Sequence, residues 1–182
     1  MGGRDKLAEP VDGVPLLRKQ AEMALGLDLP VTVALAPGRA QEELLDGLDL
    51  DVYSAACSLE GMSGTLRSAM AHLADARAVL VLLADLPELE LSDLQAVLKA
   101  RDAARKALIW RGVTEDGRAG HPILFDRALF PQFAQLKGDG GGHEIVEAAG
   151  DRVHLVPLPG MRARRDLDTP EDWAAWRAET GR

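Results

Sequence analysis

Asp85 is the residue of this sequence best placed for metal chemistry. It ends an apolar run at 79–84, and Leu86 and Pro87 follow it. Burying an unpaired carboxylate among aliphatic groups is costly, so Asp85 should emerge at the carboxyl end of a buried strand, where open α/β sheets bind ligands. A carboxylate held on a rigid strand end is suited to bind a divalent cation. The alternative is a turn or helix-capping aspartate, and this stretch alone favours that alternative.

A second carboxylate, Asp168, lies just outside a strong helix start. Thr169 is a suitable amino-terminal cap, Pro170 fits the first helical position, and Asp172 follows three residues after the cap. Acidic residues favour a helix amino terminus for electrostatic reasons alone. Asp168 is therefore a candidate metal ligand, but its place before a helix has a structural explanation that needs no function.

The amino terminus has the composition of the second half of a phosphate-binding loop. Gly2 and Gly3 allow backbone N–H groups to face an anion, and Arg4 and Lys6 add positive charge. The strand that should lead into such a loop does not precede it. A flexible basic terminus is the alternative.

Gly61 and Ser63 lie in a loop that leads into a helix expected at 65–73. A glycine-containing loop at a helix amino terminus is a plausible edge of a ligand site, because the first N–H groups of the helix are free there. Ordinary helices begin in the same way, so this signal is weak by itself.

The alternation of apolar strands with amphipathic helices predicts a layered α/β fold with right-handed crossovers. The expected strands are 31–36, 51–54, 79–84, 107–110, 121–125 and 153–157. The expected helices are 15–27, 41–48, 65–73, 92–105, 127–136, one that opens near 144, and one from 170. A capping box at 92–95 should begin the fourth helix, and the run of arginines at 162–165 should form a charged surface loop.

Composition narrows the class of protein. The chain has 182 residues, which suits a single domain spanning 1–182. Its net charge of -8 argues against a nucleic-acid or anionic-membrane surface. A single cysteine, Cys57, excludes an intrachain disulfide and a cysteine-cluster metal site, and a buried apolar role is expected for it. No apolar stretch is long enough for a membrane helix and no signal peptide is present, so a cytoplasmic location is expected.

Several short motifs, in this order and spacing, resemble the molybdenum cofactor nucleotidyltransferases, which include the guanylyltransferase and cytidylyltransferase of molybdopterin dinucleotide synthesis. The motifs are Met-Gly-Gly-Arg-Asp-Lys at 1–6, Asp-Gly-Val-Pro-Leu-Leu at 12–17, Gly-Met-Ser-Gly-Thr-Leu-Arg at 61–67, Leu-Leu-Ala-Asp-Leu-Pro at 82–87, Gly-His-Pro-Ile-Leu-Phe at 120–125, Gly-Asp at 138–139 and Asp-Thr-Pro-Glu-Asp at 168–172.

This resemblance implies a Rossmann-like nucleotidyltransferase fold, a three-layer α/β/α sandwich with a mostly parallel mixed sheet. It also implies a Mg²⁺-dependent transferase that moves CMP or GMP from CTP or GTP to molybdopterin and releases pyrophosphate. Chemistry of this kind depends on positioning and on charge neutralisation. A molybdoenzyme is a possible further partner.

The resemblance also assigns roles to individual residues. It makes Asp85 a catalytic metal ligand, Asp168 a second metal ligand and Asp166 a weaker candidate for that second place. It makes Lys6 a catalytic residue that meets the triphosphate. It places Gly2, Gly3, Arg4, Gly61 and Ser63 on the nucleotide side, and His121 and Asp139 on the acceptor side. For His121, a structural role beside Pro122 is about as good an explanation as a catalytic one.

The chain departs from the family pattern at its start. The family opens with a strand and a loop resembling Leu-Ala-Gly/Ala-Gly-x-x-x-Arg, directly before the Met-Gly pair with which this sequence begins. Either the true start lies upstream, which we favour because the other motifs are intact, or the chain is a truncated and weakly active form. Ala55 stands where many relatives have asparagine. Residues 84–87 lean toward the cytidylyltransferase and residues 2–6 toward the guanylyltransferase, so the base stays open.

Two alternatives remain at this point. The same chemistry could act on a sugar phosphate or another small phosphate acceptor. The chain could instead be a noncatalytic nucleotide- or cofactor-binding chaperone for a molybdoenzyme, because the absent loop would remove catalytic donors and leave much of the pocket.

Overall fold

The structure, a computed structural model, describes residues 5–38, 40–56, 60–138 and 140–182. Cys57 lies outside these ranges, so its expected buried role stays a prediction. No helix in the described ranges has the length and apolar character needed to cross a membrane.

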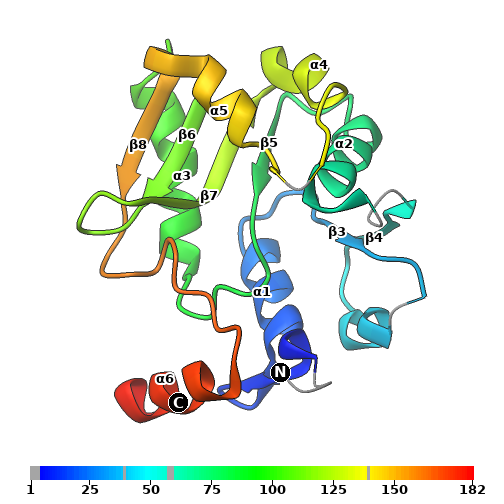
Figure 1. Ribbon diagram of the computed structural model, residues 1–182, viewed down its shortest axis with the longest axis vertical. Coiled ribbons are helices and arrows are strands. Elements are labelled where there is room, and N and C mark those ends of the chain that lie inside the picture. The colour runs from blue at the N-terminus through cyan, green and yellow to red at the C-terminus, as the bar shows by residue number, and fades with distance from the viewer. Residues whose placement is uncertain (1–4, 39, 57–59, 139) are drawn as a thin grey trace.

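A four-stranded mixed sheet forms the centre of the fold (Figure 1). Its strands, in spatial order, are β5 (Ala78–Val81), β7 (Ala119–Asp126), β6 (Ile109–Val113) and β8 (Val153–Pro157). β7 runs antiparallel to both of its neighbours, and β6 and β8 are parallel. β5, β6 and β8 therefore end on the same side of the sheet, where β7 begins. We call this side the carboxyl end of the sheet.

Two smaller sheets lie outside this centre. β3 (Thr32–Leu35) and β4 (Asp51–Ser54) pair in parallel. β1 (Pro10–Val11) and β2 (Val14–Pro15) form an antiparallel hairpin. Its two turn residues, Asp12 and Gly13, have φ angles of 53° and 81°, and positive φ at both positions matches the twist of a tight hairpin.

Helices cover both faces of the sheet, which confirms the predicted three-layer architecture (Figure 1). One face carries α2 (Met62–His72), α4 (Phe130–Phe133) and α5 (His143–Ala149), and α3 (Leu91–Ala103) covers the other. Side chains alternate along β7, so Ile123 and Phe125 enter the first core and Leu124 the second.

The remaining elements surround the carboxyl end of the sheet and the amino terminus. α1 (Leu16–Leu25) packs near α3, and α6 (Pro170–Thr180) joins the amino-terminal hairpin through a small core built around Trp173 and Trp176. The short 3-10 helices are η1 (Lys6–Ala8), η2 (Ala40–Leu45), η4 (Arg127–Leu129) and η5 (Gly150–Arg152).

Four expectations need correction. The helix expected at 41–48 is the 3-10 helix η2, which ends at Leu45. β5 is half-buried along its length and not fully buried, because it is an edge strand of its sheet. The cap of α3 is Glu90 and not Ser92: Glu90 and Asp93 form the capping box, and the Glu90 N–H donates to Asp93 Oδ2 at 3.0 Å. The helix expected at 127–136 is only a 3-10 turn followed by one turn of α4.

Candidate functional site

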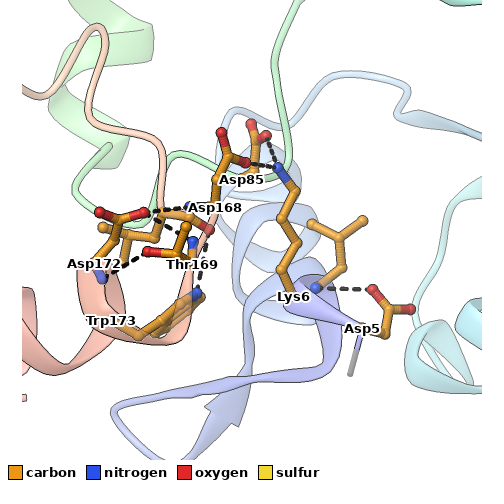
Figure 2. Close-up of polar contacts among 9 residues, drawn as sticks. Asp5, Lys6, Asp85, Asp168, Thr169, Asp172 and Trp173 are labelled. Atoms are coloured by element: carbon orange, nitrogen blue, oxygen red, sulfur yellow. Dashed lines mark hydrogen bonds and ion pairs between the residues drawn. The ribbon is translucent and has the colours of Figure 1, made fainter. Parts of the chain in front are cut away.

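Lys6, Asp85 and Asp168 meet beyond the end of β5, at the carboxyl end of the sheet. Figure 2 shows the three side chains together. The Lys6 ammonium donates to Asp85 Oδ2 at 2.7 Å and to Asp168 Oδ1 at 2.6 Å. The three residues come from η1, from the segment after β5 and from the segment before α6. We call this group the lysine cluster. It brings together three residues that the sequence analysis singled out.

Asp5 fixes the start of η1, which carries Lys6. Asp5 Oδ1 accepts a hydrogen bond from the backbone N–H of Leu7 at 3.0 Å, and Asp5 Oδ2 accepts one from Gln41 at 2.6 Å. Leu7 packs against the two small cores near the amino terminus. The backbone on either side of Lys6 is therefore held, and its side chain is directed toward the carboxylates.

A capping box holds Asp168 at the start of α6. Asp172 N–H donates to Thr169 Oγ1 at 3.1 Å, and Asp172 Oδ2 accepts from the backbone N–H groups of Thr169 and Asp168 at 2.8 and 3.2 Å (Figure 2). The buried Trp173 ring donates from Nε1 to the Leu167 carbonyl at 3.2 Å. The predicted helix start thus also determines where Asp168 lies.

The electrostatics of the lysine cluster favour a charged ammonium. Burial lowers the pKa of Lys6, but the hydrogen bonds and charges of Asp168 and Asp85 outweigh it, and the net pKa lies above its ordinary value. Asp85 Oδ1 is buried and has no hydrogen-bond partner in the described ranges. Asp85 therefore has one oxygen on the ammonium and one oxygen still able to bind a cation.

Asp166 is placed differently from Asp168. It is exposed, and its backbone N–H donates to the Arg164 carbonyl. No group of three His, Cys, Asp or Glu side chains in the described ranges is arranged to hold a metal ion. Any metal at the lysine cluster would therefore depend on two carboxylates from the protein.

Ser63 lies in the first turn of α2, behind Gly61, which caps the helix with a φ of 84°. The residue is 1% exposed, and its hydroxyl oxygen has no partner within the described residues. A buried hydroxyl without a partner is unusual and calls for an explanation. A ligand group at the amino end of α2 would supply the missing hydrogen bond.

His121 lies at the start of β7, where the segment after β8 crosses the strand. Its backbone N–H donates to the Ala163 carbonyl at 2.8 Å, and a Cβ at Gly120 would overlap that same carbonyl. The peptide bond between His121 and Pro122 is cis. Burial, together with the charge of Arg111, lowers the pKa of the imidazole to about 4, against an opposing influence of Asp85.

The remaining predicted site residues, Gly2, Gly3, Arg4 and Asp139, lie outside the described ranges. The structure adds two residues that the sequence analysis passed over. Arg111 projects from β6 beside His121, and Arg164 belongs to the run expected to be a surface loop. An arginine within an apolar strand was the available signal for Arg111.

The comparison with protein families decides the class of the chain. The MobA-like NTP transferase domain matches residues 1–153. The chain belongs to this family. It is accordingly a nucleotidyltransferase that uses a nucleoside triphosphate, which confirms the enzyme class expected from the motifs. No curated protein matches the chain.

Solved structures share the fold. Rv0371c from Mycobacterium tuberculosis H37Rv is 24% identical, with a TM-score of 0.80 over 96% of this chain and 89% of that one. Its complex with manganese, also 24% identical, gives a TM-score of 0.76 over 93% and 89%. A CMP:2-keto-3-deoxy-manno-octonic acid synthetase complexed with CTP is 15% identical, with a TM-score of 0.72 over 97% and 91%. These likenesses confirm the predicted fold class.

Proposed function

We propose that this chain transfers CMP or GMP from CTP or GTP to molybdopterin. A phosphate oxygen of the acceptor forms a bond to the α-phosphorus of the nucleotide. The bond between that phosphorus and the oxygen leading to the β-phosphate breaks, and pyrophosphate leaves. The family membership supports the reaction class, and the motif resemblance supports the choice of acceptor.

The observation that carries the proposal is the position of the Lys6 ammonium between Asp85 and Asp168. Charge neutralisation is the main task in phosphoryl-group chemistry, because negative charge builds up on the phosphate oxygens during transfer. A lysine held at the end of the sheet provides that charge. Ser63 and the amino end of α2 would contact the nucleotide, since the buried hydroxyl has no partner among the described residues.

The residues present fit a divalent cation. Mg²⁺ is usually held by one or two carboxylates together with substrate phosphates and water, and the lysine cluster offers two carboxylates and the unpartnered Oδ1 of Asp85. Asp85 and Asp168 would hold the ion, with Asp166 as the alternative to Asp168. When bound, the ion would neutralise charge on the phosphates. The manganese complex of Rv0371c agrees with a divalent metal in a protein of this fold.

The test is pyrophosphate release by the purified chain with Mg²⁺ and either CTP or GTP. We expect release to require molybdopterin and to be selective for one nucleotide. No release with either nucleotide in the presence of molybdopterin would contradict the proposal.

A sugar phosphate is the second candidate acceptor. The CTP complex of the sugar-acid synthetase shows that proteins of this fold include enzymes for other acceptors, at 15% identity. Equal or faster release with sugar phosphates than with molybdopterin would favour this alternative.

A further inference from the structure

Arg111 differs from the other half-buried arginines of the described ranges. Each of the others has a carboxylate within 4.0 Å, but Arg111 has none. The others are Arg18, Arg67, Arg101, Arg162, Arg165 and Arg177. Proteins rarely bury arginine without a partner. Arg111 is therefore the half-buried cation of the described chain that lacks an anion.

Within the described residues, a single hydrogen bond holds the Arg111 guanidinium. Its Nε–H donates to the Gly120 carbonyl at 3.0 Å. The two terminal nitrogens have no partner in the described residues. A guanidinium fixed through Nε presents these two nitrogens as a fork, which matches the spacing of two phosphate oxygens.

A second arginine lies beside the first. Arg164 donates from Nη1 to the Ala119 carbonyl at 3.1 Å, one residue away from the carbonyl that holds Arg111. Arg164 also has no carboxylate within 4.0 Å in the described ranges. Burial is the main cause that lowers the pKa of Arg111, and the charge of Arg164 is the second. The two cations therefore lie close enough to repel each other. We call Arg111 and Arg164 the arginine pair.

The strand pattern brings His121 to the same place. Arg111 pairs with Ile123 across β6 and β7, and alternation puts Arg111, Ile109 and Ile123 on one face of the sheet. His121 lies two residues before Ile123, where the register of the two strands shifts, and the charge of Arg111 reaches its imidazole. The depressed pKa of His121 keeps its imidazole neutral at pH 7, so the ring adds a hydrogen-bonding group and no third charge.

This position adjoins the lysine cluster. Asp85 is near enough to His121 for its charge to act on the imidazole, and Arg164 lies four residues before Asp168 on the same segment. Arg111 comes from β6, whose end lies at the carboxyl end of the sheet together with the end of β5. An anion on the arginine pair would therefore lie next to the site proposed for the metal and the triphosphate.

We propose that Arg111 and Arg164, with the imidazole of His121 beside them, bind the phosphate monoester of the acceptor. This inference rests on the proposed function, because the reacting group of the acceptor is a phosphate. The proposed function assigns the lysine cluster, together with the divalent cation it would hold, to the triphosphate, so the second group of cations is left for the second phosphate. The phosphates of the nucleoside triphosphate present the same kind of oxygen to these arginines. The test below distinguishes binding of the acceptor phosphate from binding of the triphosphate.

The test titrates the chain with inorganic phosphate and follows the NMR signals of His121, assigned with His121→Gln. We expect a saturable shift of these signals at pH 7. Arg111→Gln should weaken the phosphate affinity at least tenfold and Arg164→Gln at least threefold, whereas Arg111→Lys should retain an intermediate affinity. Arg105→Gln is the matched control, because exposed Arg105 also donates only to a backbone carbonyl and precedes β6 at the opposite end of the sheet.

Two results would overturn the proposal. The first is no phosphate-dependent shift of His121, or the same affinity in Arg111→Gln as in the wild type. The second is a tenfold loss of CTP or GTP affinity in Arg111→Gln, because the arginines would then belong to the triphosphate site. The expected result is nucleotide affinity within twofold of the wild type.

The same measurements separate this inference from the proposed function. A phosphate-dependent shift of His121 in a chain that binds neither CTP nor GTP would refute the proposed function and support the anion site. Normal nucleotide binding without any effect of phosphate on His121 would refute the anion site alone.

Discussion

The lysine cluster and the arginine pair are two groups of charges at the same end of one sheet, but they are compensated differently. In the lysine cluster, one ammonium lies between two carboxylates at 2.6 and 2.7 Å. In the arginine pair, the hydrogen bonds of the two guanidiniums within the described residues go only to backbone carbonyls, at 3.0 and 3.1 Å.

This difference indicates what each group requires from a ligand. The lysine cluster has excess negative charge and one free carboxylate oxygen, so it is suited to accept a further cation. The arginine pair has excess positive charge and free N–H donors, so it is suited to accept an anion. The proposed reaction would bring two phosphates and a divalent cation together, and these two groups side by side suit that combination of charges.

Replacing Lys6 should have the largest effect. Lys6→Met removes the charge that we propose faces the triphosphate, and we expect turnover to fall by roughly 100-fold or more in a pyrophosphate-release assay. Lys19→Met is the matched control, because Lys19 also pairs with a carboxylate, Asp12 at 2.6 Å, but lies outside the site. Turnover of Lys6→Met above half the wild-type value would show that the ammonium only balances the carboxylates.

The neutral state of His121 can be tested through stability. The imidazole takes up a proton near pH 6.5 in the unfolded chain and only near pH 4 in the folded chain, so protonation favours unfolding. The stabilisation is present above pH 6.5 and is lost as the pH falls toward 4. It amounts to up to about 3 kcal/mol. Urea unfolding of the wild type should show this loss and that of His121→Gln should not. Parallel pH profiles would mean that folding does not lower the pKa of His121, which would contradict a buried neutral imidazole.

The Ser63 hydroxyl is a further polar group without a partner in the described residues, and replacing it tests whether it contacts the nucleotide. Ser63→Ala should weaken nucleotide affinity by about fivefold to tenfold, because one hydrogen bond to a ligand is lost. It should leave the free energy of unfolding unchanged or raise it, because the hydroxyl has no partner in the described chain. Ser68→Ala on the same helix is the control, since its hydroxyl already donates to the Thr65 carbonyl. Unchanged nucleotide affinity in Ser63→Ala would remove Ser63 from the site.

The cap of α6 should have the smallest effect. Thr169→Ala removes the side-chain half of the capping box and should lower the free energy of unfolding by about 1 kcal/mol. Urea unfolding measures this, and nucleotide binding with Mg²⁺ should weaken a few-fold as Asp168 becomes less well placed. A stability loss without any change in binding would indicate that Asp168 does not depend on the cap.

Local signals in the sequence predicted the helix start at Thr169 correctly, because a capping box spans only four residues. The same kind of signal was wrong at α3. There Ser92 fits a capping pattern, but Arg162 pairs with Glu90 and Asp93 at 2.9 and 3.5 Å and supports the earlier cap. That contact spans about seventy positions in the chain and has no local signature.

In the candidate site too, local signals predicted individual residues, but the contacts between distant residues could not be predicted. Asp85 and Asp168 could be proposed from strand and helix ends, and Lys6 from its motif. Their contacts join residues 79 and 162 positions apart, which no periodicity reveals. The unpaired state of Arg111 is visible only when every neighbouring carboxylate is placed. Burial of β5 was overestimated because composition does not show which strand lies at a sheet edge. The single domain at 1–182 stays a prediction.

The most direct test of the account is the affinity of CTP and GTP for the chain, measured by calorimetry with and without Mg²⁺, for the wild type, Asp85→Asn and Asp166→Asn. We predict that one nucleotide binds in a Mg²⁺-dependent manner, that Asp85→Asn abolishes this dependence, and that Asp166→Asn retains it. Nucleotide affinity that does not depend on Mg²⁺, or that is the same in Asp85→Asn as in the wild type, would contradict the assignment of the lysine cluster as the metal site.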